Sequence, residues 1–260
     1  MDLVHVVVLA VMQGLVEFLP ISSSGHLILV PALLGWSDQG LAFDVAVHLG
    51  TLSAVVIYFR HELLGLLRAA FDVRKKDFEL AWSLVLATVP LGIAGLLMAD
   101  LVDGVLRSPA VIAATTAGFG VLLWLADVFN RGTRSEHELG MRRVVLIGLA
   151  QVLALVPGTS RSGITMTAGL ALGLSRAAAA RFSFLLSVPA IGMAASWETY
   201  QLVVTSEPVL WGTLALATLL SAVTAFAAIA TFLRFIERAG MWGFAVYRLV
   251  LAAVIVIVLY

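Results

Sequence analysis

QGLVEFLPISSSGH spans residues 13–26, and a second stretch, QVLALVPGTSRSGIT, spans residues 151–165. Each stretch interrupts otherwise apolar sequence with proline, glycine and hydroxyl side chains. The apolar pieces on either side are too short to cross about 30 Å of hydrocarbon at about 1.5 Å per residue. We therefore predict that each stretch is the tip of a re-entrant helix-loop-helix, which enters and leaves the membrane by the same face.

The composition is that of a membrane protein. Of 260 residues, 61% are hydrophobic and 12% charged, with a mean hydropathy of +1.05, whereas soluble domains average about 25% charged residues. The long uncharged runs are continuously apolar rather than alternating, which predicts helical spans and not a β-barrel. Sixteen basic residues balance 16 acidic ones, so we expect no nucleic-acid partner. The absence of cysteine excludes disulfides and thiolate metal sites.

An internal repeat relates the two stretches. A shift of 138 residues superimposes five pairs: Gln13 and Gln151, Leu15 and Leu153, Ser22 and Ser160, Ser24 and Ser162, and Gly25 and Gly163. We predict two halves, 1–130 and 140–260, joined by a polar linker at 131–139. The first half holds a re-entrant pair at about 3–35 and spans at about 41–60, 80–99 and 108–127. The second holds a re-entrant pair at about 144–173 and spans at about 177–197, 208–233 and 241–260.

These elements define the predicted fold class. It is an all-α polytopic membrane protein with six spans, forming a single integrated membrane domain. Because each half has three spans, an odd number, the second half starts from the opposite face, and the two repeats have inverted topology. The N-terminus has no basic region and no small-residue cleavage site, so we expect it to be retained rather than removed as a signal peptide.

The basic residues predict the orientation. The topology places one of them, Arg107, on one side of the membrane and 13 on the other. Since Lys and Arg accumulate in cytoplasmic loops, the richer side is cytoplasmic, and both termini face outward. The 13 residues are Arg60, Arg68, Arg74, Lys75, Lys76, Arg131, Arg134, Arg142, Arg143, Arg176, Arg181, Arg234 and Arg238. Inverted re-entrant pairs bring their tips together near mid-depth, where a site is expected.

The residues at the tips suit phosphate chemistry. Glu17 could act as a base or hold a divalent cation, and Ser23 or His26 could attack phosphorus. Arg161 offers a planar fork for phosphate oxygens, and hydroxyl and N–H groups before a helix form an anion site. The candidate binding residues around them are Gln13, Ser22, Ser24, Gly25, Ser160, Ser162, Gly163 and Thr165.

Structural roles for the same residues remain open at this stage. The serines could cap the short helices, Glu17 and Arg161 could be a neutralising pair inside the membrane, and His26 could be a hydrogen-bonded core residue. Arg248 lies midway along the last predicted span and must find a partner there.

Both stretches resemble signatures of a known family, the bacterial undecaprenyl-diphosphate phosphatases associated with bacitracin resistance. Residues 13–26 are similar to its first signature and residues 157–163 to its second, and the likeness extends through 182–186 to 244–248. The resemblance implies a multi-pass enzyme of the bacterial inner membrane. It implies hydrolysis of a C55 polyprenyl diphosphate lipid to the monophosphate carrier used in peptidoglycan synthesis, at a site that opens to the periplasm.

The resemblance also implies particular roles and a cofactor. Glu17 matches the acidic motif residue, Ser23 and His26 the candidate nucleophile and proton-transfer residues, and Arg161 the phosphate-binding arginine. A divalent cation, Mg²⁺ or Ca²⁺, is implied, with Glu17 as its ligand. Gln13 departs from the Glu that many members carry there, so Glu17 would act without a second carboxylate beside it.

Three questions stay open on sequence alone. Inverted repeats with broken helices are also the architecture of secondary transporters and lipid-carrier flippases, so a carrier without hydrolase activity is the alternative function. Attack by Ser23, His26 or an activated water is each compatible with the motif. The oligomeric state is not fixed either, and a homodimer is compatible with the sequence.

Overall fold

The computed structural model describes residues 2–37, 39–103, 105–205 and 210–259. These residues form eleven α-helices and three short 3-10 helices, and within them the only β-type pairing is an isolated bridge between Arg134 and Leu174. The α-helices are α1 (Leu3–Val16), α2 (Ser23–Leu34), α3 (Leu41–Tyr58), α4 (Arg60–Ala69), α5 (Phe78–Asp103), α6 (Pro109–Phe129), α7 (Gly140–Val152), α8 (Arg161–Ala171), α9 (Arg176–Thr205), α10 (Trp211–Ala239) and α11 (Trp242–Leu259). The 3-10 helices are η1 (Val105–Arg107), η2 (Glu136–Glu138) and η3 (Leu153–Leu155).

Six of these helices are long and apolar enough to cross a membrane: α3, α5, α6, α9, α10 and α11. Each overlaps one of the predicted spans, so the all-helical class and the number of spans are confirmed. The predicted ends of two spans were wrong, because α9 continues beyond 197 to Thr205 and α10 beyond 233 to Ala239. The start of the predicted span at 208–233 and Tyr260, the last residue of the predicted span at 241–260, lie outside the described residues.

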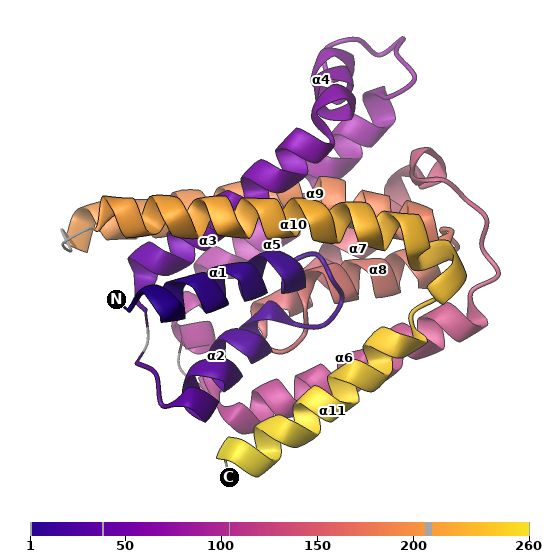
Figure 1. Ribbon diagram of the computed structural model, residues 1–260. Helices are drawn as coiled ribbons and strands as arrows, with labels where there is room; N and C mark the ends of the chain where they lie inside the picture. Colours follow the sequence, from indigo (N-terminus) through magenta and orange to yellow (C-terminus); the bar gives the residue numbers. More distant parts are fainter. Residues whose placement is uncertain (1, 38, 104, 206–209, 260) are drawn as a thin grey trace.

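One helix was not predicted. Helix α4 follows α3 almost without a break and projects from the helical bundle, at the upper right of Figure 1. It carries Arg60, Glu62 and Arg68, while Leu66 is buried. It is therefore amphipathic rather than continuously apolar, and a search for membrane spans overlooks such a helix because its charges interrupt the hydrophobic run.

Two pairs of short helices stand where the re-entrant pairs are predicted. Helices α1 and α2 flank residues 17–22, and α7 with η3 is separated from α8 by residues 156–160. Both second helices begin in the same way: Ser22 (φ 74°) and Ser160 (φ 69°) are their N-caps, and within the described chain they alone combine a positive φ with a side chain. Their hydroxyls accept hydrogen bonds from the N–H groups of Gly25 and Gly163. The shared unusual conformation lies at positions that the 138-residue shift superimposes.

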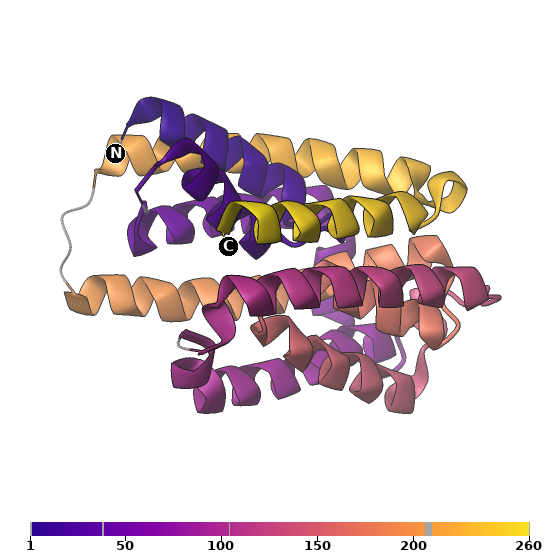
Figure 2. The ribbon, with the colours of Figure 1, turned by 90° about the horizontal axis from the view of Figure 1, so that it is seen from below.

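The two halves of the chain interlock. Helix α10 packs against α1 and α3, and α5 packs correspondingly against α7 and α9. Helices α6 and α11 lie side by side, as Figures 1 and 2 show. At Gly14 of α1, an added Cβ would lie 1.9 Å from Thr224 Oγ1 of α10, so this close approach requires glycine.

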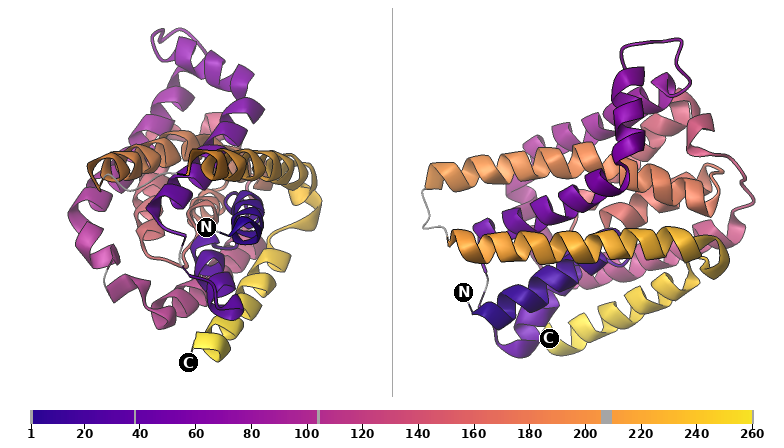
Figure 3. Two further views of the ribbon diagram at one scale, coloured as in Figure 1. Left: turned by 60° about the vertical axis from the view of Figure 1, so that its left-hand side comes forward. Right: turned by 45° about the horizontal axis from the view of Figure 1, so that its top comes forward.

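The ends of the bundle differ. Helix α1 begins and α11 ends in the left-hand half of Figure 2, while in the right-hand view of Figure 3 the linker between α6 and α7 lies at the right edge and α4 projects at the top, right of centre. The two short-helix pairs reach into the bundle between these ends. Their loops are thereby surrounded by protein, which satisfies the backbone groups that lipid could not.

Candidate functional site

The loops of the two short-helix pairs are in contact, and for brevity we call them tip 1 (residues 17–25) and tip 2 (residues 156–163). Ser24 Oγ accepts a hydrogen bond from the N–H of Gly158 at 3.1 Å. Ser162 Oγ donates to the carbonyl of Leu19 at 2.9 Å. Ser24 and Ser162 are related by the 138-residue shift, so the equivalent serine of each tip forms a hydrogen bond with the other tip. The sequence-predicted meeting of the two motifs is therefore present in the structure.

Glu17 is the centre of the polar contacts at tip 1. Its Oε2 accepts hydrogen bonds from Gln13 Nε2 at 2.9 Å and from Ser23 Oγ at 3.1 Å. Gln13 lies one helical turn before Glu17, which brings their side chains to one face of α1. The Ser23 hydroxyl thus donates directly to a carboxylate, the arrangement in which a nearby base can accept its proton.

Arg161 of tip 2 reaches the same carboxylate. Its Nη2 lies 3.3 Å from Glu17 Oε1, and the two side chains are only 12% and 9% exposed. Its Nη1 donates to the carbonyl of Ser183 in α9 at 3.3 Å. Because the pair is largely removed from water, each charge depends on the other. An incoming phosphate group would compete with Glu17 for the guanidinium, since both offer paired oxygens.

His26 is placed differently from Ser23. Its Nδ1 lies 2.7 Å from the carbonyl of Ser22, and its Nε2 lies 2.5 Å from the hydroxyl of Tyr247 in α11. Since a carbonyl only accepts, Nδ1 carries the hydrogen and Nε2 accepts one from Tyr247. No hydrogen bond joins His26 to Ser23 or Glu17 within the described residues, and both of its ring nitrogens are engaged.

The remaining predicted residues surround the tips. Ser22 and Ser160 cap α2 and α8, and Gly25 and Gly163 supply the capped N–H groups. Thr165 faces α9, where its Oγ1 lies 2.7 Å from Ser183 Oγ. Ser183 contacts both Thr165 and Arg161 but was not singled out from the sequence as a site residue. A lone serine between two phenylalanines in a long span offers little signal by itself.

Arg248 holds the two tips together. It is 0% exposed, and among the described residues its guanidinium donates only to backbone carbonyls. In tip 1 the acceptor is Pro20, at 3.3 Å; in tip 2 they are Gly158 and Thr159, at 2.9 and 3.0 Å. The sequence indicated that Arg248 needs a partner, yet it could not show that carbonyls from distant segments provide it, those of Thr115 and Thr116 in α6 included.

These contacts give the site a net positive charge. Glu17 and Arg161 neutralise each other, whereas none of the hydrogen bonds of Arg248 goes to a carboxylate. A buried cation with dipoles but no counter-ion favours an anion nearby. The tips therefore combine the Glu17–Arg161 ion pair, the hydroxyl of Ser23 and the positive charge of the nearby Arg248. This combination suits the binding of a phosphate ester or anhydride.

The residues present were also compared with what a divalent cation needs. No group of three or more His, Asp or Glu side chains that could hold a metal ion occurs in the described chain. The carboxylate and amide oxygen atoms at the tips are those of Glu17, which already contact Arg161, Gln13 and Ser23, and the Oε1 of Gln13, a buried atom without a hydrogen-bond partner. Mg²⁺ is commonly held by one or two carboxylates together with substrate phosphates. This set fits an ion that takes most of its ligands from a bound diphosphate and from water.

Comparisons with known proteins agree with the two motifs. The family model described as bacitracin resistance protein BacA matches residues 6–254. Undecaprenyl-diphosphatase 2 of Stutzerimonas stutzeri is 55% identical to this chain, over 99% of this chain and 98% of its own length. The undecaprenyl-diphosphatase of Nitrosococcus oceani is 52% identical, over 98% of this chain and 98% of its own length. That of Campylobacter curvus is also 52% identical, over 96% of this chain and 97% of its own length. With the match running through both tips and all six spans, the chain belongs to the bacitracin resistance protein BacA family.

Proposed function

We propose that this protein is an undecaprenyl-diphosphate phosphatase, which hydrolyses the lipid diphosphate to undecaprenyl phosphate and inorganic phosphate. The observation that carries the proposal is the hydrogen bond from Ser23 to Glu17 beside Arg161, which joins a nucleophile, a base and an anion-binding group at one place. The family and the names of its relatives support the substrate. Such an activity would recycle the lipid carrier for peptidoglycan synthesis and confer bacitracin resistance.

In the proposed reaction, Ser23 Oγ attacks the terminal phosphorus while Glu17 accepts its proton. The anhydride bond breaks, and the lipid monophosphate leaves with the bonding electrons. Water then attacks the phosphoserine, giving inorganic phosphate and restoring the hydroxyl. Ser23 is favoured over His26 as the nucleophile because Ser23 donates to a carboxylate, whereas the Nε2 of His26 is occupied by Tyr247. Catalysis would come mainly from positioning and charge stabilisation.

Arg161 would bind the phosphate that is transferred. It lies next to Glu17 and Ser23 and at the start of α8, where N–H groups and the helix dipole also favour an anion. Arg248, whose guanidinium contacts both tips, would add a second positive charge close to the bound phosphate. Together they would stabilise the charge that builds up on the phosphoryl oxygens in the transition state.

We also propose that a divalent cation, Mg²⁺ or Ca²⁺, accompanies the diphosphate, with Glu17 and Gln13 Oε1 as its protein ligands. Once bound, it would neutralise charge on the phosphate oxygens. Gln13 would supply a neutral ligand where a second carboxylate would bind the ion more tightly.

Replacing Gln13 by glutamate tests this assignment. The added carboxylate is expected to lower the Mg²⁺ concentration for half-maximal phosphate release about three- to tenfold, because affinity for hard cations rises with the charge of the ligands. Phosphate release would be measured against Mg²⁺ after treatment with a chelator. A wild-type enzyme that is indifferent to the chelator, or a variant with an unchanged Mg²⁺ dependence, would contradict the cation assignment.

For the topology, we propose two inverted repeats with re-entrant tips and both termini in the periplasm. The repeated serine conformation at Ser22 and Ser160 supports it, as does the exchange in which α10 packs on α1 and α3 and α5 packs on α7 and α9. The bundle end that carries α4 and the linker would then be cytoplasmic. A reporter fused after Tyr260 is expected to be active only in the periplasm, and cytoplasmic activity would reverse the orientation.

The deciding experiment for function is phosphate release from a polyprenyl diphosphate by the purified protein, with Ser23→Ala beside the wild type. Rapid acid quenching is expected to trap phosphate on Ser23 of the wild type and none on the variant. Ser53→Ala, which removes an exposed serine hydroxyl of α3, is the matched control and should behave as the wild type. If the folded wild type binds the lipid but releases no phosphate, the phosphatase proposal fails and a lipid carrier takes its place.

A further inference from the structure

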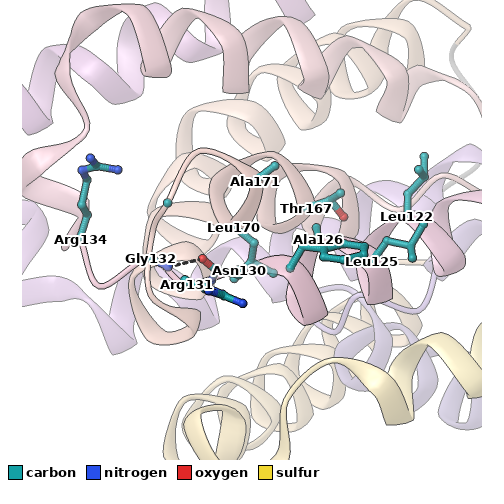
Figure 4. A pocket seen from close by; sticks show the side chains of 12 residues that line it. Leu122, Leu125, Ala126, Asn130, Arg131, Gly132, Arg134, Thr167, Leu170 and Ala171 are labelled. Atoms are coloured by element: carbon teal, nitrogen blue, oxygen red, sulfur yellow. Dashed lines mark hydrogen bonds between the residues drawn. The ribbon is translucent and has the colours of Figure 1, made fainter.

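A cavity of about 620 Å³ lies away from the tips, between the C-terminal ends of α6 and α8. Apolar side chains form most of its wall, among them Leu122, Leu125 and Ala126 from α6 and Leu170 and Ala171 from α8. Figure 4 shows these two rows facing each other, with Arg131 next to Asn130 where the apolar strip ends. The cavity thus has an apolar body and a cationic rim.

Arg131 brings to this rim a positive charge that no ion pair of the described residues balances. Two arginines of α9 at this end of the bundle are paired: Arg176 lies 2.6 Å from Asp127, and Arg181 lies 2.6 Å from Glu136. Arg131 is exposed and has no ion pair or hydrogen bond from its side chain within the described residues. Arg134, further along the linker, donates to the carbonyl of Leu172 at 3.4 Å and also interacts electrostatically with the carboxylate of Glu138.

The position of the cavity matches the boundary between hydrocarbon and water. Phe129, the last residue of α6, is 77% exposed, and Val128 before it is 56% exposed, so the apolar surface of this span continues to its end. Arg131 follows two residues later. A molecule that fills this site would have an apolar part next to α6 and α8 and a negative group level with the linker.

We propose that this cavity binds an anionic phospholipid, with Arg131 contacting the phosphate of the head group and the acyl chains lying along α6 and α8. Basic pockets between transmembrane helices are known sites for anionic head groups. The linker is tied to the end of α8 by Asn130 Nδ2, which donates to the carbonyl of Leu174 at 2.9 Å. A lipid here would therefore lie along the junction between α6, the linker and α8.

The test measures lipid binding to the purified full-length protein by native mass spectrometry, with dioleoylphosphatidylglycerol or dioleoylphosphatidylcholine added. The wild type is expected to retain the anionic lipid preferentially. Arg131→Gln should weaken that binding about fivefold, the effect of one basic residue near a membrane surface. Ala171→Phe should weaken it by filling the cavity without changing any charge. Arg142→Gln, which removes an exposed arginine of α7 outside the cavity, should leave it unchanged.

Three results would overturn the proposal. These are equal retention of the two lipids by the wild type, an equal loss of binding in Arg142→Gln and Arg131→Gln, or displacement of the anionic lipid by inorganic phosphate alone. The last would indicate a site for free phosphate, with no role for the apolar wall. Thermal unfolding of each variant verifies that it is folded, and because neither Arg131 nor Ala171 lies at the tips, the outcome is independent of the phosphatase proposal.

Discussion

Glu17→Gln is expected to lower the kcat for phosphate release about 10³-fold. The substitution keeps the size of the side chain but removes the base that accepts the proton of Ser23, at 3.1 Å, and a positioned general base contributes about 10²–10⁴-fold. It also removes the carboxylate that is paired with Arg161. Phosphate release and binding of the lipid diphosphate would be measured separately. In the presence of chelator, binding should persist or tighten, because Arg161 is then free to contact the phosphate and no cation is present to lose a ligand.

Two further variants distinguish catalysis from folding. Glu17→Asp keeps the charge that Arg161 needs but shortens the side chain away from Ser23, so it should retain stability while losing most of its kcat. Glu79→Gln, which alters an exposed carboxylate at the start of α5, should match the wild type in both respects. If Glu17→Gln is folded and releases phosphate at the wild-type rate, Glu17 is not the base.

Much of this architecture could be predicted because membranes constrain helices strongly. A span must be apolar over about 20 residues, and such runs are visible in one sequence. The tips were predictable for a related reason: Pro20 and the serines that follow it break a run that lipid would otherwise require to be helical. The repeat then indicated which two breaks belong together, and Ser24 and Ser162 do contact the opposite tips.

Other parts of the site depend on distances that no local pattern encodes. His26 is close to Ser23 in sequence, yet its ring nitrogens bond to Ser22 and to Tyr247, which is 221 residues away. Residues three apart in a helix lie on the same side, so the spacing of Ser23 and His26 favours a shared contact. The packing of α2 against α11 instead places the His26 ring next to Tyr247. Ser183 likewise lies at the site because α8 packs against α9, a contact that the local sequence does not indicate.

Arg248→Met is expected to destabilise the protein by about 3–5 kcal/mol and to reduce phosphate release at least about 100-fold. Removing one partner of a buried charged hydrogen-bond network leaves its other members unpaired. Here the carbonyls of Pro20, Gly158 and Thr159 would lose the donor that fixes tip 1 against tip 2. A displacement of about 1 Å between the tips would separate Arg161 from Ser23, and misplacements of that size cost about 10²-fold. Thermal unfolding and phosphate release in the same detergent measure the two effects.

Two effects of opposite sign determine how Arg248→Met changes the stability of the protein, so the prediction can fail in either direction. Burying a guanidinium without a counter-ion is itself unfavourable, so methionine would stabilise the protein if desolvation outweighed the hydrogen bonds. We expect the hydrogen bonds to prevail, because the fork spans α6 and both tips, and no methionine can replace it. Arg248→Lys retains the charge but not the fork, so it should recover binding of the lipid diphosphate more than kcat. Leu249→Met, at an exposed position of α11, controls for the substitution itself. An unchanged unfolding temperature together with wild-type phosphate release in Arg248→Met would show that the tips are held in place by helix packing alone.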